Sequence, residues 1–204
     1  MQDHTTEQEL KDRLRLIESM IAEGRRTTES WGWTFVLWGV AYYVAIAGSI
    51  WRQSVWAWPV TMVAAVIVTV VVASLKAGNH PETTLGRAIS SIWVSLGISM
   101  FLLFMALGLS GRLTDQHLFI SVASAILGMA NGASGLLLRW KIQFACAIVW
   151  WAAAVASCFG TEAQSMIVFL VAIFLCQIVF GIYGMIAEAQ GRKPRQTHDG
   201  PAHA

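Results

Sequence analysis

Residues 88–110 read AISSIWVSLGISMFLLFMALGLS, an apolar run without a single ionisable side chain. A helix needs about 20 such residues to cross the hydrocarbon core of a bilayer, which is about 30 Å thick. Lipid offers no partner to backbone N–H and C=O groups, so a continuous apolar run of this length forms a helix. The stretch therefore predicts a membrane-spanning helix.

Five further runs of the same kind occur at residues 31–51, 56–75, 117–138, 141–160 and 165–187. The composition agrees, because 56% of the 204 residues are hydrophobic and only 13% are charged, whereas a globular domain carries about 25% charged residues. Thr161 with Gln164 predicts a capping box at the start of the last run. No run is broken by proline in its interior, so we expect six continuous helices. The expected fold is all-α, a polytopic membrane protein built as a six-transmembrane-helix bundle.

The chain divides into three parts. Residues 1–30 are expected to form a cytoplasmic amphipathic helix that leads into the first span, residues 31–187 the six-helix transmembrane domain, and residues 188–204 a disordered cytoplasmic tail. The hydrophilic first thirty residues, followed by a full-length apolar run, predict an uncleaved anchor rather than a signal peptide.

The distribution of basic residues predicts the orientation of the spans. Twelve of the 14 Lys and Arg residues lie in the N-terminal part, the tail and the loops on one side, and only Arg52 and Arg112 lie on the other. Because loops rich in Lys and Arg stay on the cytoplasmic side, both termini are expected to be cytoplasmic.

The N-terminal part carries an apolar stripe. Thr6 with Glu9 predicts a capping box, and Leu10, Leu14, Ile17 and Met20 or Ile21 then recur at helical spacing among charged residues. Such a helix can rest on the bilayer surface or on the protein's own cytoplasmic loops. Alternatively it docks a partner or a second copy, with Leu10, Leu14, Ile17 and Ile21 as the docking residues.

Part of this region resembles a group of known sequences. The segments are IESMI at 17–21, RR at 25–26, WG at 31–32 and LWG at 37–39. Over residues 14–45 they resemble the start of uncharacterised bacterial multi-span inner-membrane proteins with an amphipathic N-terminal leader. The resemblance implies a bacterial inner-membrane setting and carries no activity with it.

The spans lack the groups that most membrane chemistry requires. Their centres hold no ionisable residue, which argues against proton-coupled or ion-coupled transport. Histidines occur only in loops, tails or at a span end, and Cys146, Cys158 and Cys176 are expected to pack as small hydrophobic groups. Serine-hydrolase, Walker and dinucleotide motifs are missing. We therefore expect no catalytic residue, no metal and no cofactor, and hence no enzyme.

The fourth span carries a face of small residues. Its members recur every three or four positions: Ser121, Ser124, Gly128, Gly132 and Gly135. Small residues let the backbone of a second helix come close. We therefore expect this span to lie at the centre of the bundle.

A polar and aromatic site is predicted inside the membrane from Asn131, Gln177, Trp150 and Trp151. The two carboxamides lie at similar depth, so they are expected to bond to each other or to one shared water or ligand; alternatively, each bonds a nearby backbone carbonyl or serine. The two tryptophans lie near the midplane, where they either fill gaps in the core or form walls of an apolar pocket.

These patterns favour a non-enzymatic integral membrane protein that binds or regulates a partner through its cytoplasmic face. The expected partners are membrane lipids and either a second copy or another cytoplasmic or membrane protein; the net charge of +2 gives no reason to expect nucleic acid. The alternative is a small transporter or channel for an uncharged or lipid-like solute.

The orientation is testable by labelling single cysteines in intact cells with a membrane-impermeant maleimide. Thr114→Cys and Glu162→Cys should react, because they lie outside, whereas His80→Cys and Gln196→Cys should not. Labelling of residue 80 from outside would contradict the six-span topology.

Overall fold

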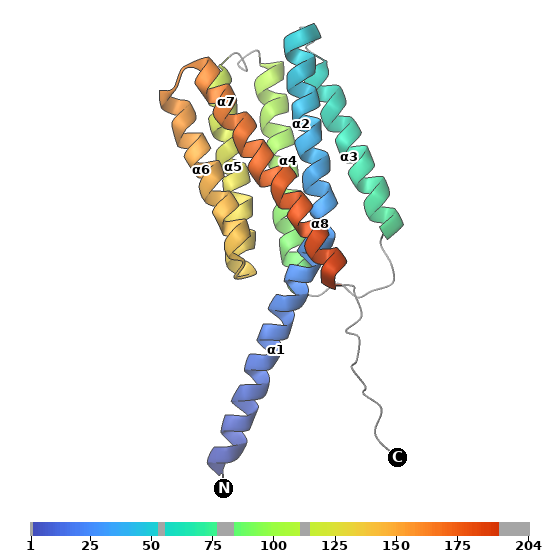
Figure 1. Ribbon diagram of the computed structural model, residues 1–204, viewed down its shortest axis with the longest axis vertical. Helices are drawn as coiled ribbons and strands as arrows, with labels where there is room; N and C mark the ends of the chain where they lie inside the picture. The colour runs from blue at the N-terminus through green and yellow to red at the C-terminus, as the bar shows by residue number, and fades with distance from the viewer. Residues whose placement is uncertain (1, 53–55, 77–83, 111–114, 192–204) are drawn as a thin grey trace, which may run out of the picture.

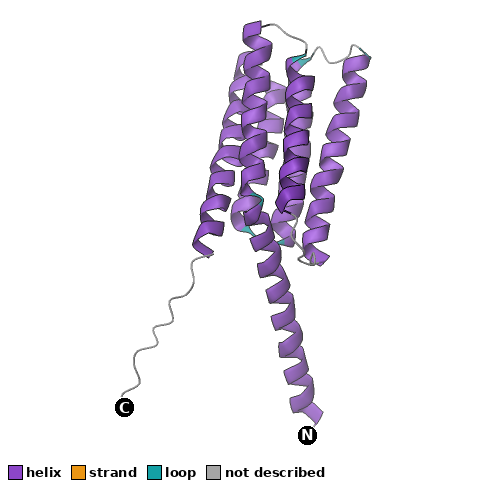
Figure 2. Ribbon diagram, turned by 90° about the vertical axis from the view of Figure 1, so that its right-hand side faces the viewer, coloured by secondary structure: helices purple, strands orange, loops and turns teal. Residues whose placement is uncertain are grey.

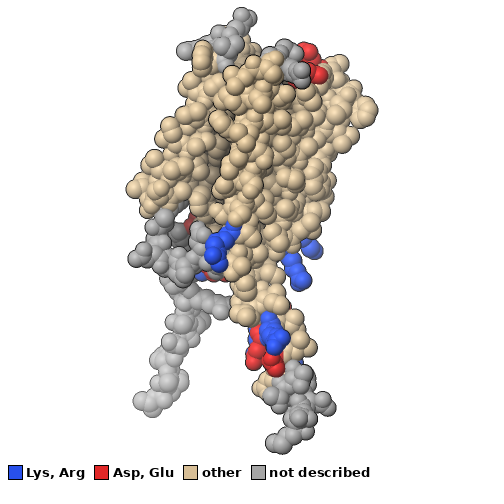
Figure 3. Space-filling view, turned by 180° about the vertical axis from the view of Figure 1, so that it is seen from behind, with Lys and Arg blue, Asp and Glu red and all other residues tan. Residues whose placement is uncertain are grey.

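The computed structural model describes residues 2–52, 56–76, 84–110 and 115–191, and all elements in these ranges are helical. Six helices are long and apolar enough to cross a membrane, which confirms the expected all-α bundle. They are α2 (Gly32–Arg52), α3 (Ala57–Lys76), α4 (Thr84–Leu109), α5 (Gln116–Leu137), α6 (Lys141–Phe159) and a last helix made of α7 (Glu162–Ile173), η1 (Phe174–Val179) and α8 (Phe180–Gly191) (Figure 1). On the face shown in Figure 3, charged side chains lie at the two ends of the bundle and the side is uncharged.

The last helix differs from its predicted form in two ways. It continues to Gly191, so the boundary expected after residue 187 lies inside the helix, and residues 192–204 of the expected tail lie outside the described residues. It also contains a π-helical segment, η1, so the prediction of a continuous α-helix is wrong. A π-turn inserts one extra residue without needing Gly or Pro, and the sequence FLCQIV contains neither. The predicted capping box of Thr161 and Gln164 is confirmed.

Helix α1 (Gln2–Ser30) leaves the bundle at the end where α8 finishes and extends away from it (Figures 1 and 2). We call this end of the molecule the α1 end. The helix already begins at Gln2, so Thr6 lies within it and the predicted capping box at Thr6 is wrong; residues 2–23 contain no Gly or Pro to stop the helix. Among the described residues, only the base of α1 contacts a turn of this end, the one between α5 and α6. That the rest of the helix lies on the bilayer surface or docks a partner stays a prediction.

Helix α5 is the most buried of the spanning helices, so it contributes most to the centre of the core, and it packs most extensively against α6. A Cβ atom at Gly132 would lie 2.9 Å from Cη2 of Trp151, and one at Gly135 would lie 2.7 Å from the backbone nitrogen of Phe144. At Gly135 the backbone of α6 approaches to within the space that a side chain would fill, whereas at Gly132 the ring of Trp151 occupies that space. Ser124 is fully buried beside this face, and Ser121 contacts Cys158 of α6.

Aromatic rings join the more peripheral helices to this centre. The ring of Phe119 on α5 lies 5.1 Å from that of Trp58 on α3, 4.7 Å from Phe104 on α4 and 6.3 Å from Phe169 on α7. Such pairs contribute about 0.5–1.5 kcal/mol beyond the area they bury. Phe119 thus ties α3 and α4 to the helix at the centre of the bundle.

The substitution Gly132→Leu should lower the stability of the purified protein by about 1–3 kcal/mol, the usual effect of overpacking a close contact. The matched control is Gly97→Leu on α4, because a Cβ atom there meets nothing within 4 Å. Thermal unfolding in detergent measures both variants. An equal loss of stability in Gly132→Leu and Gly97→Leu would show that the contact between α5 and α6 does not explain the effect of a larger residue at position 132.

Candidate functional site

The exposed apolar stripe of α1 is the most prominent surface outside the spans. Leu10, Leu14 and Ile17 keep 58%, 53% and 51% of their surface exposed. Farther along the same face, Ile21 is half-buried, and Gly24 is covered by the side chains of Leu85 and Leu138. The face therefore starts open and ends covered by the bundle, so three of the four predicted docking residues are uncovered.

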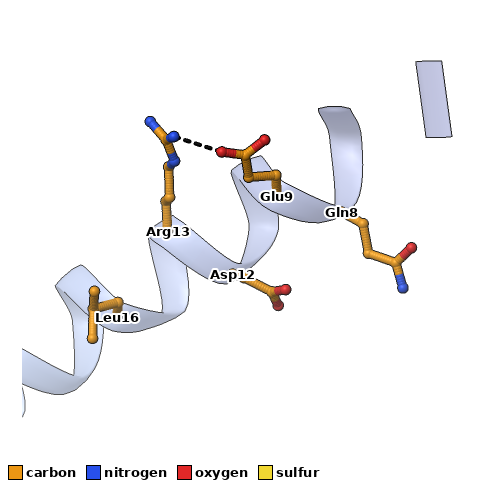
Figure 4. Close-up of a pocket in the computed structure, with 5 residues that line it drawn as sticks. All are labelled: Gln8, Glu9, Asp12, Arg13 and Leu16. Carbon is orange, nitrogen blue, oxygen red and sulfur yellow. Dashed lines mark hydrogen bonds and ion pairs between the residues drawn. The ribbon is translucent and has the colours of Figure 1, made fainter. Parts of the chain in front are cut away.

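Two ion pairs join charged side chains within the exposed part of α1. Arg13 forms an ion pair with Glu9, one turn earlier on the same helix, and Arg15 pairs with Asp12. Figure 4 shows Arg13 and Glu9 reaching toward each other along this helix. Such exposed pairs add only about 0.3–0.5 kcal/mol, so most of the capacity of this helix to bind lies in its apolar stripe.

The base of α1 is anchored to the turn between α5 and α6. Nη2 of Arg25 donates to the carbonyl oxygens of Leu138 at 3.2 Å and Arg139 at 3.1 Å. The amide of Trp140 donates to Gly135 O, and Arg139 has a φ of 48°. This pattern is that of a Schellman cap, in which glycine usually holds the position with positive φ. Arg25 therefore stabilises a turn that carries a non-glycine residue in a left-handed conformation.

A cavity of about 440 Å³ lies where α1 meets α8. Five charged residues line it: Glu23, Arg25, Arg26, Glu29 and Glu188. The pKa of the Glu29 carboxyl is raised above its usual value, mainly because the group is partly buried. The positive charges of Arg25 and Arg26 lower this pKa, and the negative charge of Glu188 raises it. In the described structure Glu29 forms no ion pair with either guanidinium group, so part of the desolvation of its carboxylate is not compensated.

The predicted pair of carboxamides is not joined by a hydrogen bond. Asn131 is fully buried, and its Nδ2 donates at 2.9 Å to the carbonyl oxygen of Leu127 on its own helix. Gln177 lies in η1, where its Cβ lies 2.9 Å from the position of a Cβ at Gly39 of α2. Nδ2 of Asn131 thus bonds a nearby backbone carbonyl, as the alternative prediction has it, while a water or ligand shared with Gln177 stays a prediction.

The two predicted tryptophans face different surroundings. Trp150 is fully buried, and its ring lies 6.0 Å from that of Phe169 on α7. Trp151 is 40% exposed and lies over Gly128 and Gly132 of α5. Neighbouring residues on a helix point about 100° apart, so Trp150 fills the core while Trp151 covers the outside of the α5–α6 contact.

Several fully buried polar atoms on the inner faces of α5 and α6 have no hydrogen-bond partner among the described residues. They belong to Ser124, Asn131, Ser134, Gln143 and Trp150. Both carboxamide atoms of Gln143 are unpaired. Buried polar groups normally find a partner in protein, water or ligand, so this set marks a polar interior within an apolar bundle.

Gln143 was not predicted as a site residue. It lies close to the start of α6, where a glutamine is easily taken as an interfacial residue. The spacing in the sequence could have revealed it, because Gln143 lies on the same helix face as Ala147 and Trp150, at i, i+4 and i+7. All three are fully buried.

A cluster at the end of the bundle opposite α1 joins three helices. Nδ1 of His117 lies 2.9 Å from the carbonyl oxygen of Ser157 and 3.0 Å from Oγ of Ser165. Because a carbonyl oxygen only accepts, Nδ1 donates to Ser157 in the tautomer that carries its proton on Nδ1, whereas in the other tautomer Nδ1 accepts from Oγ of Ser165. Ser165 itself is 1% exposed. The cluster therefore joins the start of α5, the end of α6 and the start of α7.

Comparisons with protein-family models, with curated proteins and with solved structures find no match.

Proposed function

We propose that the protein is a non-enzymatic integral membrane protein that binds a protein partner through the exposed stripe of α1. The observation that carries this proposal is the uncovered face of Leu10, Leu14 and Ile17 on a helix that extends from the bundle. An isolated amphipathic helix gains most of its stability from packing its apolar face. A partner helix would supply that packing and extend the contact that begins at Gly24.

A second copy of the chain is the partner that the charges favour. The apolar residues of the α1 stripe are separated by four, three and four positions, which is the spacing of the core positions of a coiled coil. They are Leu10, Leu14, Ile17 and Ile21. In a parallel pair, Arg13 of one helix would face Glu18 of the other, a match of opposite charges. Two copies inserted in one membrane with the same orientation present their α1 helices in parallel.

The proposed location is the bacterial inner membrane, with both termini cytoplasmic. The excess of Lys and Arg on one side of the spans supports the orientation, and the resemblance over residues 14–45 supports the membrane. In this arrangement the partner binds on the cytoplasmic side.

The substitution Ile17→Lys should weaken self-association, because burying an isoleucine contributes about 2 kcal/mol, or a factor of about 30 in affinity. The control Ser19→Lys places the same charge on the opposite face of α1. Light scattering of the detergent-purified protein should give two copies for the wild type and Ser19→Lys, and one for Ile17→Lys. A wild type with a single copy per particle, or equal effects of both variants, would contradict the proposal.

A second candidate function is a channel or transporter for a small uncharged solute, and the unpaired polar atoms on α5 and α6 favour it. They offer donors and acceptors without charge, which suits a neutral polar molecule. In proteoliposomes the wild type should accelerate the flux of urea or glycerol, and Gln143→Leu should abolish the gain. Ser95→Leu, on the exposed side of α4, is the control. A wild type no faster than empty liposomes would exclude this function for these two solutes.

A further inference from the structure

The cavity between α1 and α8 lies at the level where a membrane presents its lipid head groups. Ser30 of its lining precedes the span Gly32–Trp51, and Ala187 and Glu188 belong to the last turns of the span Glu162–Gln190. Trp31 and Trp33, which follow Ser30 in the chain, stack with ring centroids 6.2 Å apart. Tryptophan at the end of a spanning helix is typical of the interface between hydrocarbon and water.

The lining carries charges of both signs. Glu23, Glu29 and Glu188 contribute three carboxylates, while Arg25 and Arg26 contribute two guanidinium groups. A site for an anion alone would not need the carboxylates, and a site for a metal ion would not place two guanidinium groups beside them. The combination suits a ligand with a phosphate and an ammonium group a few bonds apart.

Two of these charged groups, on Arg25 and Glu29, have polar atoms without a partner in the described structure. Nη2 of Arg25 is used by the α5–α6 turn, but its Nε is buried without a hydrogen-bond partner. The Glu29 carboxylate is partly desolvated and lacks an ion pair in the described structure. An ammonium group beside Glu29 would compensate its carboxylate, and the exposed guanidinium group of Arg26 is available to a phosphate in the cavity.

The surroundings also suit a lipid rather than a free head group. Helix α8 presents Ile182, Met185 and Ile186 with 45%, 44% and 51% of their surfaces exposed. These side chains precede Glu188 on the same helix, toward the interior of the span, where acyl chains would lie.

We propose that this cavity binds the head group of a phospholipid with a primary ammonium, with Glu29 and Glu188 on the ammonium and Arg26 and Arg25 on the phosphate. The lining contains no aromatic side chain. A quaternary ammonium, which offers no N–H donor and is held by aromatic rings, should therefore bind less well. This site is independent of partner binding by the distal part of α1.

Native mass spectrometry of the full chain tests the proposal with phosphatidylethanolamine, phosphatidylcholine and phosphatidylglycerol of identical acyl chains. The ethanolamine lipid should bind about tenfold more tightly than the choline lipid, because charge-assisted hydrogen bonds to the ammonium are lost when it is methylated. Glu29→Gln should remove this preference. The control Glu162→Gln, an exposed carboxylate at the other end of the bundle, should keep it.

Thermal unfolding of the lipid-free protein checks that Glu29→Gln remains folded. Because this substitution removes a partly buried charge, it should not lower the melting temperature. Equal binding of the three lipids by the wild type would overturn the proposal, as would a preference that persists in folded Glu29→Gln. Equally strong binding of chain-free glycerophosphoethanolamine would overturn the assignment to a lipid.

Discussion

The close contact between α5 and α6 is the interaction on which the rest of the bundle depends. Glycine at 128, 132 and 135 removes the side chains that would hold the two helices apart, and in lipid such close packing replaces the hydrophobic effect as the source of helix association. Because α5 is held at the centre, its other side is available to the rings of α3, α4 and α7. A wider separation of α5 and α6 would also displace Trp150 from its contact with Phe169.

Much of this architecture is predictable because its causes are local in the sequence. The length of an apolar run decides whether a helix can span the bilayer, and the spacing of small residues decides which face of a helix can be approached closely. The spans and the glycine face of the fourth span follow from these two rules. The exposed stripe of Leu10, Leu14 and Ile17 follows equally from helical periodicity.

The remaining features depend on contacts between distant segments, which a single sequence does not display. Periodicity predicts that Asn131 and Gln177 lie at similar depth, but not that one bonds its own helix while the other packs against α2. Likewise, η1 contains no helix-breaking residue, and Arg139 adopts a positive φ where glycine would be expected. Arg25, more than a hundred residues earlier, bonds the turn that contains Arg139. The start of α1 was misplaced for a simpler reason, since a capping motif can also occur inside a helix.

The bonds from Arg25 to the turn between α5 and α6 link the direction of α1 to the end of α5. Leu10 lies about 21 Å from Gly24 along the helix, at about 1.5 Å per residue. A change of angle at Gly24 therefore displaces the exposed stripe much farther than it displaces Arg25. Because Arg25 bonds the carbonyl groups of Leu138 and Arg139, the position of the distant stripe depends on two hydrogen bonds to the turn that ends α5.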